Sequence, residues 1–382
     1  MARTIAVLTT SRADYSHLYW PLRDLASDPA INLRLIVMGP HLSPEFGNTV
    51  REIEQDGFSI HSRIECLLSS DSDVGMAKTI GVATLGLADC LAQVRPDLLL
   101  IIADRFEMLA PATVAVALRI PVAHIEGGEI SEGAIDNSIR NALTMLSHVH
   151  FTSTESARAR VIAFGEEAWR VHKVGSPSLD HLRRSRLKSR EELETELQLD
   201  LQTPFALIGF HPATIARDTT REAAALFEAL SSASPRLFFC YPNADAGSRE
   251  LIQRTRAFCE TRPDSKILVN LDPVTYWSLL GNALLLIGNS SSGIMEAASL
   301  ATPVVNVGIR QQGRERGANV LDAPADAQAI IQNINIASSQ EFRRGLVGMQ
   351  NPYGDGYSSE RIARVLGAVP LGESLLMKKS VT

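Results

Sequence analysis

The chain has 382 residues, 45% hydrophobic and 21% charged, which is typical of a globular protein with two domains. Its formal net charge of −6 argues against a nucleic-acid partner, because nucleic-acid-binding surfaces are normally basic. The four scattered cysteines lack metal-ligand spacing, and no signal peptide or membrane-spanning run is visible. We therefore expect a cytoplasmic protein with reduced thiols, no metal site and no membrane partner.

Apolar, β-branched runs alternate with helical patterns along the first half of the chain. The predicted strands are residues 4–8, 33–38, 98–103, 121–125 and 149–152, and the predicted helices include 17–26, 76–94 and 107–118. Continuous apolar runs of this length are typical of buried parallel strands with helical crossovers. This half therefore predicts a parallel α/β sheet.

A charged stretch without a strand pattern, residues 183–201, follows and is interpreted as a helical linker between domains. A second set of strands is predicted over residues 205–210, 237–241, 267–269, 284–287 and 303–307. We therefore predict an α/β protein of two similar domains facing a cleft. These are residues 1–182 and 183–366, followed by a frayed tail over 367–382.

Two carboxylates follow neighbouring strands of the first domain. Asp104 ends the run over 98–103 and Glu126 ends the run over 121–125, with Arg105, Glu129 and Asp136 close by in sequence. Ligands of open α/β sheets bind at the carboxyl ends of the strands. Either acid alone is more simply read as a helix cap or a solvated turn residue. The pair in this setting instead favours acid–base chemistry.

The second domain contains a strand, a polar turn and a helix over residues 284–300. The turn is Asn289-Ser290-Ser291-Ser292-Gly293, whose hydroxyl and N–H groups suit an anion such as a diphosphate. Simple N-capping explains one serine, but three in a row favour the anion. Glu296 is a candidate for accepting hydrogen bonds from a ribose. The turn lacks a Walker lysine, so ATP hydrolysis is not indicated, and no GxGxxG motif is present, so no nicotinamide or flavin cofactor is expected.

Basic residues also follow strands in both halves. Arg310, Arg314 and Arg316 lie in the loop over 308–319, where arginine suits bidentate phosphate contacts. A solvated basic loop is the alternative. Other polar residues placed after strands are Arg12, Asp14, His41 and His211. Their distribution predicts a sugar-nucleotide site built from strand ends of both domains.

These residues stand in motifs that resemble the hydrolysing UDP-N-acetylglucosamine 2-epimerases over nearly the whole chain. The matching stretches include SRADYSHL, GPHLSPEFGNT, ADRFEMLA, HIEGGE, IDNSIR, GFHP, YPNADAGS, IGNSSSGIMEA and RQQGRE. The resemblance implies the fold of glycosyltransferase type B, with two facing Rossmann-like domains. It also implies a homodimer or homotetramer, and no cofactor.

The resemblance assigns site residues position by position. It places the catalytic carboxylates on Asp104, Glu126 and Asp136. We expect the substrate and nucleotide contacts to be Arg12, His41, Arg105, His211, Asn243, Asp245, Ser290, Ser291, Glu296, Arg310 and Arg314. Three departures stand out: ADRFE replaces the usual GDRFD, GGEISEGAID is one residue longer than usual, and Asn141 stands where relatives often carry His.

The expected reaction eliminates the nucleoside diphosphate across C1–C2 of a UDP-linked 2-acetamido sugar and then adds water, inverting C2. UDP-N-acetylglucosamine is the first choice of substrate, and a UDP- or GDP-linked 2,4-diacetamido sugar is the alternative. HIEGGE favours hydrolysis over the related non-hydrolysing epimerases, which usually carry HVEAGLR. A type B glycosyltransferase and a catalytically silent sugar-nucleotide-binding regulator are the remaining alternatives.

Overall fold

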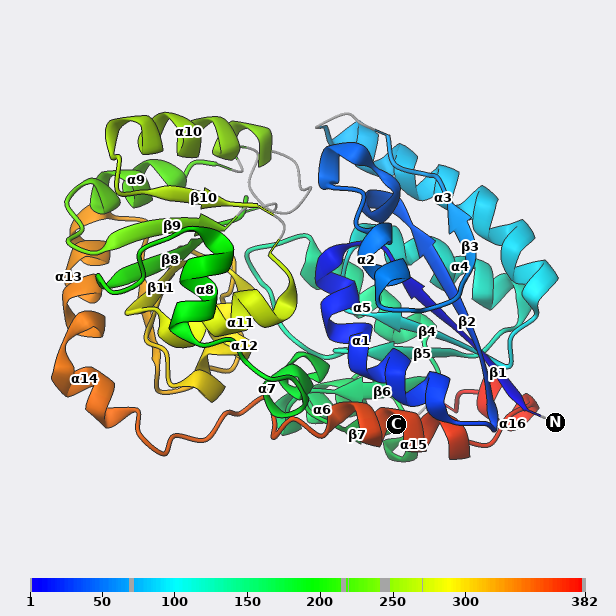
Figure 1. Ribbon diagram of the computed structural model, residues 1–382. Helices are drawn as coiled ribbons and strands as arrows, with labels where there is room; N and C mark the ends of the chain where they lie inside the picture. The colour runs from blue at the N-terminus through cyan, green and yellow to red at the C-terminus, as the bar shows by residue number, and fades with distance from the viewer. Residues whose placement is uncertain are drawn as a thin grey trace. The chain divides into compact units, whose positions relative to one another are not determined.

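The chain forms two compact α/β units, shown in the computed structural model of Figure 1. The structure describes residues 2–68, 72–213, 218, 220–240, 248–269 and 271–379. Unit 1 comprises Met1–Glu129, Asp136–Asp180 and Gly354–Thr382, and unit 2 comprises Ile130–Ile135 and His181–Tyr353. The six-residue segment Ile130–Ile135 therefore leaves unit 1, packs in unit 2 and returns.

Unit 1 is built on a seven-stranded sheet in the order β3-β2-β1-β4-β5-β6-β7. Its strands are β1 (Arg3–Thr9), β2 (Ile31–Met38), β3 (Ile60–Ile64), β4 (Leu98–Ile102), β5 (Val122–Ile125), β6 (Val149–Thr152) and β7 (Val171–Lys173). Its main helices are α1 (Arg12–Ser27), α2 (Val50–Gln55), α3 (Asp73–Val94), α4 (Leu109–Leu118), α5 (Asp136–Leu146), α6 (Glu155–Ala163), α15 (Ser358–Ala368) and α16 (Glu373–Leu376).

Unit 2 is built on a six-stranded sheet in the order β10-β9-β8-β11-β12-β13. Its strands are β8 (Phe205–Gly209), β9 (Arg236–Cys240), β10 (Lys266–Leu268), β11 (Leu285–Gly288), β12 (Val304–Val307) and β13 (Val320–Ala323). Its helices are α8 (Arg190–Leu197), α9 (Ala223–Ser231), α10 (Ser248–Thr261), α11 (Pro273–Asn282), α12 (Ser291–Met295), α13 (Ala327–Ser338) and α14 (Gln340–Gly345), while α7 (Asp180–Arg184) spans the boundary between the units.

The strand order decides where a ligand can bind in each unit. All paired strands are parallel, and the direction of the order reverses between β1 and β4 in unit 1 and between β8 and β11 in unit 2. At such a switch point the crossover helices leave in opposite directions and open a crevice at the carboxyl ends of the strands. Four of the polar residues predicted from the sequence follow these four strands: Arg12, Asp104, His211 and Ser290.

The predicted α/β class and parallel sheets are confirmed, and the predicted central strands match the observed ones within a few residues. Three strands that the sequence does not predict, β3, β7 and β13, are all edge strands. Side chains of β3 alternate between half-buried and exposed, so its sequence IHSRI lacks a continuous apolar run. Edge strands are covered incompletely and therefore carry a weaker hydrophobic signal.

Two segments differ from their expected roles. The charged stretch predicted as a linker contains α8, which belongs to unit 2 and fully buries Leu193. The described part of the predicted tail, residues 367–379, is docked on unit 1, where Arg170 donates hydrogen bonds to the carbonyls of Leu375 (2.7 Å) and Met377 (2.8 Å). Residues 354–366 also belong to unit 1, where α15 (red in Figure 1) packs beside α1.

Helix α3 is long and apolar enough to cross a membrane by length and composition alone, which the sequence analysis did not expect. It packs against α4 and β3 of unit 1. Core helices of globular proteins pass the same test, so the helix is weak evidence for a membrane.

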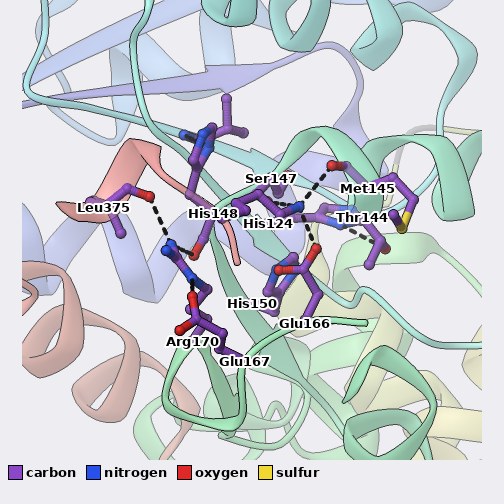
Figure 2. A network of polar contacts seen from close by, with 12 residues as sticks. His124, Thr144, Met145, Ser147, His148, His150, Glu166, Glu167, Arg170 and Leu375 are labelled. Atoms are coloured by element: carbon purple, nitrogen blue, oxygen red, sulfur yellow. Dashed lines mark hydrogen bonds and ion pairs between the residues drawn. The ribbon is translucent and has the colours of Figure 1, made fainter. Parts of the chain in front are cut away.

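Unit 1 buries three imidazoles on and beside β5 and β6, in the polar network of Figure 2. His124 and His150 lie opposite each other in the register of these strands, and His148 directly precedes β6. Burial is the main cause that lowers the pKa of His148 to about 4, and the nearby Lys378 and Arg170 add to it. His148 is therefore neutral at neutral pH, and its Nδ1 accepts a hydrogen bond from the Val122 N–H (3.1 Å).

This burial predicts a measurable linkage between pH and stability. Unfolded His148 binds a proton below a pKa of about 6.5, whereas folded His148 does so only near 4, so its contribution to stability falls as pH falls between these values. Asn at position 148 keeps an acceptor near Nδ1 but cannot titrate. The free energy of unfolding, measured in urea, should change between about pH 7 and pH 5 in both proteins. We expect its decrease to be smaller in His148→Asn than in the parent, by roughly 1–2 kcal/mol.

Burial also raises the pKa of Asp180 to about 7, so this group makes the free energy of unfolding rise as pH falls, opposite to the effect of His148. The effect of His148 is therefore measured as a difference between variants and not from the parent alone. His61→Asn, at an exposed position of β3, is the matched control. Equal pH dependence in His148→Asn and His61→Asn would contradict the prediction.

Candidate functional site

The carboxyl ends of β4 and β5 carry two acids on unusual backbone. Ala103, which precedes Asp104, has φ 57°, and Glu126 itself has φ 65°. A residue with a Cβ atom rarely adopts this left-handed conformation, and such strain persists where the surrounding structure enforces it. The Ala103 N–H donates to Ile125 O (2.9 Å) and the Glu126 N–H to Phe151 O (2.8 Å), so both turns stay tied to the neighbouring strand.

Asp104 forms an ion pair with Arg140 of α5. The Arg140 side chain is 1% exposed, and its Nη1 also donates to the Glu129 carbonyl (3.1 Å). An adjacent guanidinium stabilises the charged form of a carboxylate. Sequence reasoning missed Arg140, although the IDNSIR motif contains it. Its spacing of four residues from Asp136 puts both on one face of α5, which is a signal that could have identified it.

The carboxyl group of Glu126 contacts two polar side chains that come from other elements. Its Oε1 lies 2.9 Å from Nδ1 of His17 in α1 and accepts a hydrogen bond from the Ser176 hydroxyl (3.0 Å), which follows β7. Glu126 is 5% exposed and Ser176 is fully buried. Neither partner was predicted from the sequence, because each comes from a segment distant from HIEGGE. The His17–Glu126 contact can carry a proton, as imidazole and carboxylate groups do in acid–base catalysis.

The third predicted acid, Asp136, is the first residue of α5. This helix also supplies Arg140, so α5 connects Asp136 with the carboxylate of Asp104. The three predicted carboxylates therefore belong to three adjoining elements of unit 1: the ends of paired strands β4 and β5 and the start of α5.

At the switch point of unit 1, Arg12 begins α1 and Arg105 follows Asp104. Arg105 forms a two-pronged ion pair with the fully buried Glu107, at 3.1 Å from Nε and 2.9 Å from Nη2. Burial raises the pKa of Glu107 and also that of Asp14, and Arg105 opposes both shifts. One guanidinium therefore partly neutralises two buried carboxyl groups.

Two predicted ligand contacts, His41 and Arg314, are buried and hydrogen-bonded within the protein. His41 is 1% exposed, and its ring nitrogens lie 2.9 Å from the Thr9 hydroxyl and 2.7 Å from the Thr49 hydroxyl. Arg314 is 8% exposed and donates to the carbonyl of Ile130 (3.1 Å). Both polar heads have partners inside the protein, and their assignment as substrate contacts stays a prediction.

In unit 2 the buried Asn289 connects the loops that follow β8 and β11. Its Oδ1 accepts from the His211 N–H (2.7 Å), and its Nδ2 donates to the His211 carbonyl (2.9 Å). The preceding Gly288 has φ 136°, and a Cβ atom there would lie 2.2 Å from Gly209 O. Only glycine permits this close approach of the two strands.

The predicted phosphate-binding groups lie around the hydrogen-bonded pair Asn289 and His211. The Ser290 hydroxyl caps α12, Ser291 begins that helix, and Arg310 donates to the Asn289 carbonyl (3.0 Å). Glu296, predicted to contact ribose, is 2% exposed. Asn243 and Asp245 lie outside the described residues. Within the described part of the chain, no group of three or more His, Cys, Asp or Glu side chains is arranged to hold a metal ion.

The ion pair between Asp104 and Arg140 is testable without a substrate. Arg140→Met removes a buried guanidinium and leaves the Asp104 carboxylate, which is 20% exposed, without its partner, so the free energy of unfolding is expected to fall by up to about 3 kcal/mol. Asp104→Asn combined with Arg140→Met should cost less than the sum of the two single changes, with a coupling energy of about 1 kcal/mol or more in urea unfolding. Additive effects would show that the two side chains do not interact energetically.

Comparison with known proteins finds the same similarity throughout the chain. Residues 23–367 match the family description UDP-N-acetylglucosamine 2-epimerase. The chain is 35% identical to a hydrolysing UDP-N,N'-diacetylbacillosamine 2-epimerase of Legionella pneumophila, covering 99% of each chain. It is 31% identical to a UDP-N-acetylglucosamine 2-epimerase of Neisseria meningitidis, covering 88% of each.

Solved structures show the same architecture. A UDP-N-acetylglucosamine 2-epimerase from Neisseria meningitidis, bound to UDP-N-acetylglucosamine, superposes with a TM-score of 0.80 at 17% identity, over 95% of this chain and 99% of that one. Together with the two parallel sheets, this match confirms the predicted α/β fold with two Rossmann-like domains, the fold of glycosyltransferase type B.

Proposed function

The chain belongs to the UDP-N-acetylglucosamine 2-epimerase family and is a nucleotide-sugar 2-epimerase, and we propose that it is the hydrolysing kind. In this reaction the enzyme releases a free 2-epimeric acetamido sugar and a nucleoside diphosphate. The observation that carries the proposal is the arrangement of Asp104 with Arg140 and of Glu126 with His17 and Ser176 at paired strand ends. The similarity to the hydrolysing relative from Legionella pneumophila supports the same conclusion.

The chemistry requires charge stabilisation and proton transfer at opposite faces of the sugar. The C1–O bond to the diphosphate breaks with loss of the C2 hydrogen, which forms a C1–C2 double bond. Water then adds its hydroxyl to C1, and C2 gains a proton on the face opposite the one that lost it. One carboxyl group cannot reach both faces, so at least two acid–base groups are needed.

We assign Glu126 as the acid–base group at C2, because His17 and Ser176 hold its carboxyl and His17 can exchange a proton with it. The Asp104 carboxylate, paired with Arg140, stabilises positive charge that develops at C1 as the diphosphate departs. Asp136, at the start of α5, takes part in protonation or water activation on the second face.

The nucleoside diphosphate is assigned to Ser290, Ser291 and Arg310 of unit 2, with His211 and Glu296 as further contacts. Support comes from Arg310, which donates a hydrogen bond to the carbonyl of Asn289, the residue before the three serines, at the unit 2 switch point. Arg12 and Arg105 remain proposed contacts from unit 1. The protein is proposed to act without a cofactor, as a cytoplasmic homodimer or homotetramer.

The substrate class is a nucleotide-linked 2-acetamido sugar. UDP-N-acetylglucosamine is the first candidate, since the family description and the Neisseria meningitidis relative carry its name. UDP-N,N'-diacetylbacillosamine is a second candidate, because the Legionella pneumophila relative named for it is 35% identical over the whole chain. Its GDP-linked counterpart is a third candidate.

Turnover in heavy water tests the reaction and the substrate together. The purified protein with each nucleotide sugar should release a free sugar that is epimeric and deuterated at C2, together with nucleoside diphosphate, as followed by NMR. Deuterium is expected because the C2 proton delivered in the second step comes from solvent. A nucleotide-linked epimer without free diphosphate would establish the non-hydrolysing reaction. Turnover only with an added acceptor would establish a glycosyltransferase, and binding without turnover would establish a regulator.

Glu126→Gln separates chemistry from nucleotide binding. The amide keeps the size of the side chain but cannot take up a proton, so kcat should fall by about a thousandfold or more. The affinity for UDP, measured by calorimetry, should change by less than about threefold, because the acid acts on the sugar. Glu155→Gln, on the surface of α6, is the matched control with unchanged kcat. Retained turnover with lost UDP binding would contradict the assignment.

A further inference from the structure

A fully buried imidazole lies between the elements that carry the proposed catalytic groups. His124 is in β5, two residues before Glu126, and is 0% exposed. Its Nε2 lies 2.8 Å from the carbonyl oxygen of Ala103, the residue before Asp104. A carbonyl oxygen only accepts hydrogen bonds, so Nε2 carries the proton and donates it. The ring therefore ties the strand that bears Glu126 to the turn that bears Asp104.

The other side of the ring faces α5. Its Nδ1 lies 3.4 Å from the Thr144 hydroxyl oxygen (Figure 2). That hydroxyl donates to the Arg140 carbonyl (2.9 Å). A Cβ atom on Gly127 would lie 3.1 Å from Nδ1 and 3.0 Å from the Thr144 hydroxyl oxygen, so the glycine leaves room for this contact. One side chain thus touches the turn after β4, the strand β5 and the helix that carries Arg140 and Asp136.

The turn that His124 contacts needs support. Ala103 holds a left-handed φ of 57°, a backbone conformation that is unfavourable for a residue with a Cβ atom. Its N–H donates to Ile125 O, and the hydrogen bond from His124 holds its carbonyl, so both ends of this residue are fixed to β5. Releasing the carbonyl would free the peptide that sets the direction of Asp104 toward Arg140.

The ring also avoids adding a charge beside the carboxylates. Burial is the main cause that lowers the pKa of His124 to about 4, opposed by its hydrogen bond to Ala103 and by nearby Glu126. The imidazole is therefore neutral at neutral pH and can position Asp104 and Glu126 without screening their charges.

We propose that His124 is a positioning residue for the epimerase reaction: its Nε2–H holds the Ala103 carbonyl and thereby orients Asp104 relative to Glu126. This inference rests on the proposed function for its kinetic readout. It goes beyond the carboxylates themselves, because His124 acts through the backbone and is not proposed to touch the substrate.

Two substitutions of similar polarity separate this function from simple core packing. The amide nitrogen of Gln reaches the place of imidazole Nε2, whereas the shorter Asn side chain reaches only the place of Nδ1. We expect His124→Gln to keep kcat within about fivefold, and His124→Asn to lower kcat about a hundredfold with KM changed by less than threefold, since small misplacements of reacting groups have costs of this size. Both variants remove an imidazole from the core, so thermal unfolding should be affected similarly.

Equal kcat in the two variants, when both are folded, would overturn the proposal and leave His124 as a core residue. An independent measurement covers the case in which neither variant folds. Long-range ¹H–¹⁵N NMR of the unaltered protein should show His124 as the neutral Nε2–H tautomer near pH 7. A proton on Nδ1 would overturn the proposal, because the hydrogen bond to Ala103 would then be absent.

Failure of the epimerase assignment can be distinguished from failure of this inference. If the unaltered protein turns over no nucleotide sugar, the proposed function fails. The coupling energy between Asp104 and Arg140, obtained from urea unfolding, still tests the orientation of Asp104 without any substrate. We expect this coupling to be retained on the His124→Gln background and reduced by at least half on the His124→Asn background. Equal coupling on both backgrounds would overturn the positioning of Asp104.

Discussion

The site depends on one property of parallel sheets: the carboxyl ends of all strands lie at the same edge, so the residues that follow the strands lie there too. In unit 1 this brings Asp104 and Glu126 to the ends of paired strands β4 and β5, although a helix separates them in sequence. The reversal of strand order between β1 and β4 then opens the edge at the place where α1 begins. His17 of α1 reaches Glu126 for this reason.

The second constraint is that buried charges need partners. Asp104 pairs with Arg140 and Glu166 with Lys378, from segments that packing brings close, and Glu107 pairs with Arg105, two residues before it in the chain. Isolated charges in the interior are too costly to persist. The same requirement ties the C-terminal residues to unit 1. Arg170 donates to the carbonyls of His148, just before β6, and of Leu375 in α16, and Lys378 donates to a carbonyl in α5.

Much of the fold could be predicted because central parallel strands are buried on both faces. Runs such as LLLII in β4 are apolar throughout and are therefore recognisable as buried strands, so the sequence predicts the central strands within a few residues of their observed positions. The edge strands β3, β7 and β13 and the docked C-terminal segment were not predicted, whereas the edge strand β10 was. Their burial is partial or depends on a single partner such as Arg170, and neither leaves a periodic pattern in the sequence.

The sequence by itself determined the α/β class, the two sets of strands and the acids that follow β4 and β5, because local hydrophobic pattern and chain order are sufficient for these. Tertiary structure alone decided which polar residues act together. It paired Asp104 with Arg140 and Glu126 with His17 and Ser176. It also turned His41 and Arg314 inward to protein partners. The physical reason is that a side chain's partner depends on how distant segments pack, which no local pattern records.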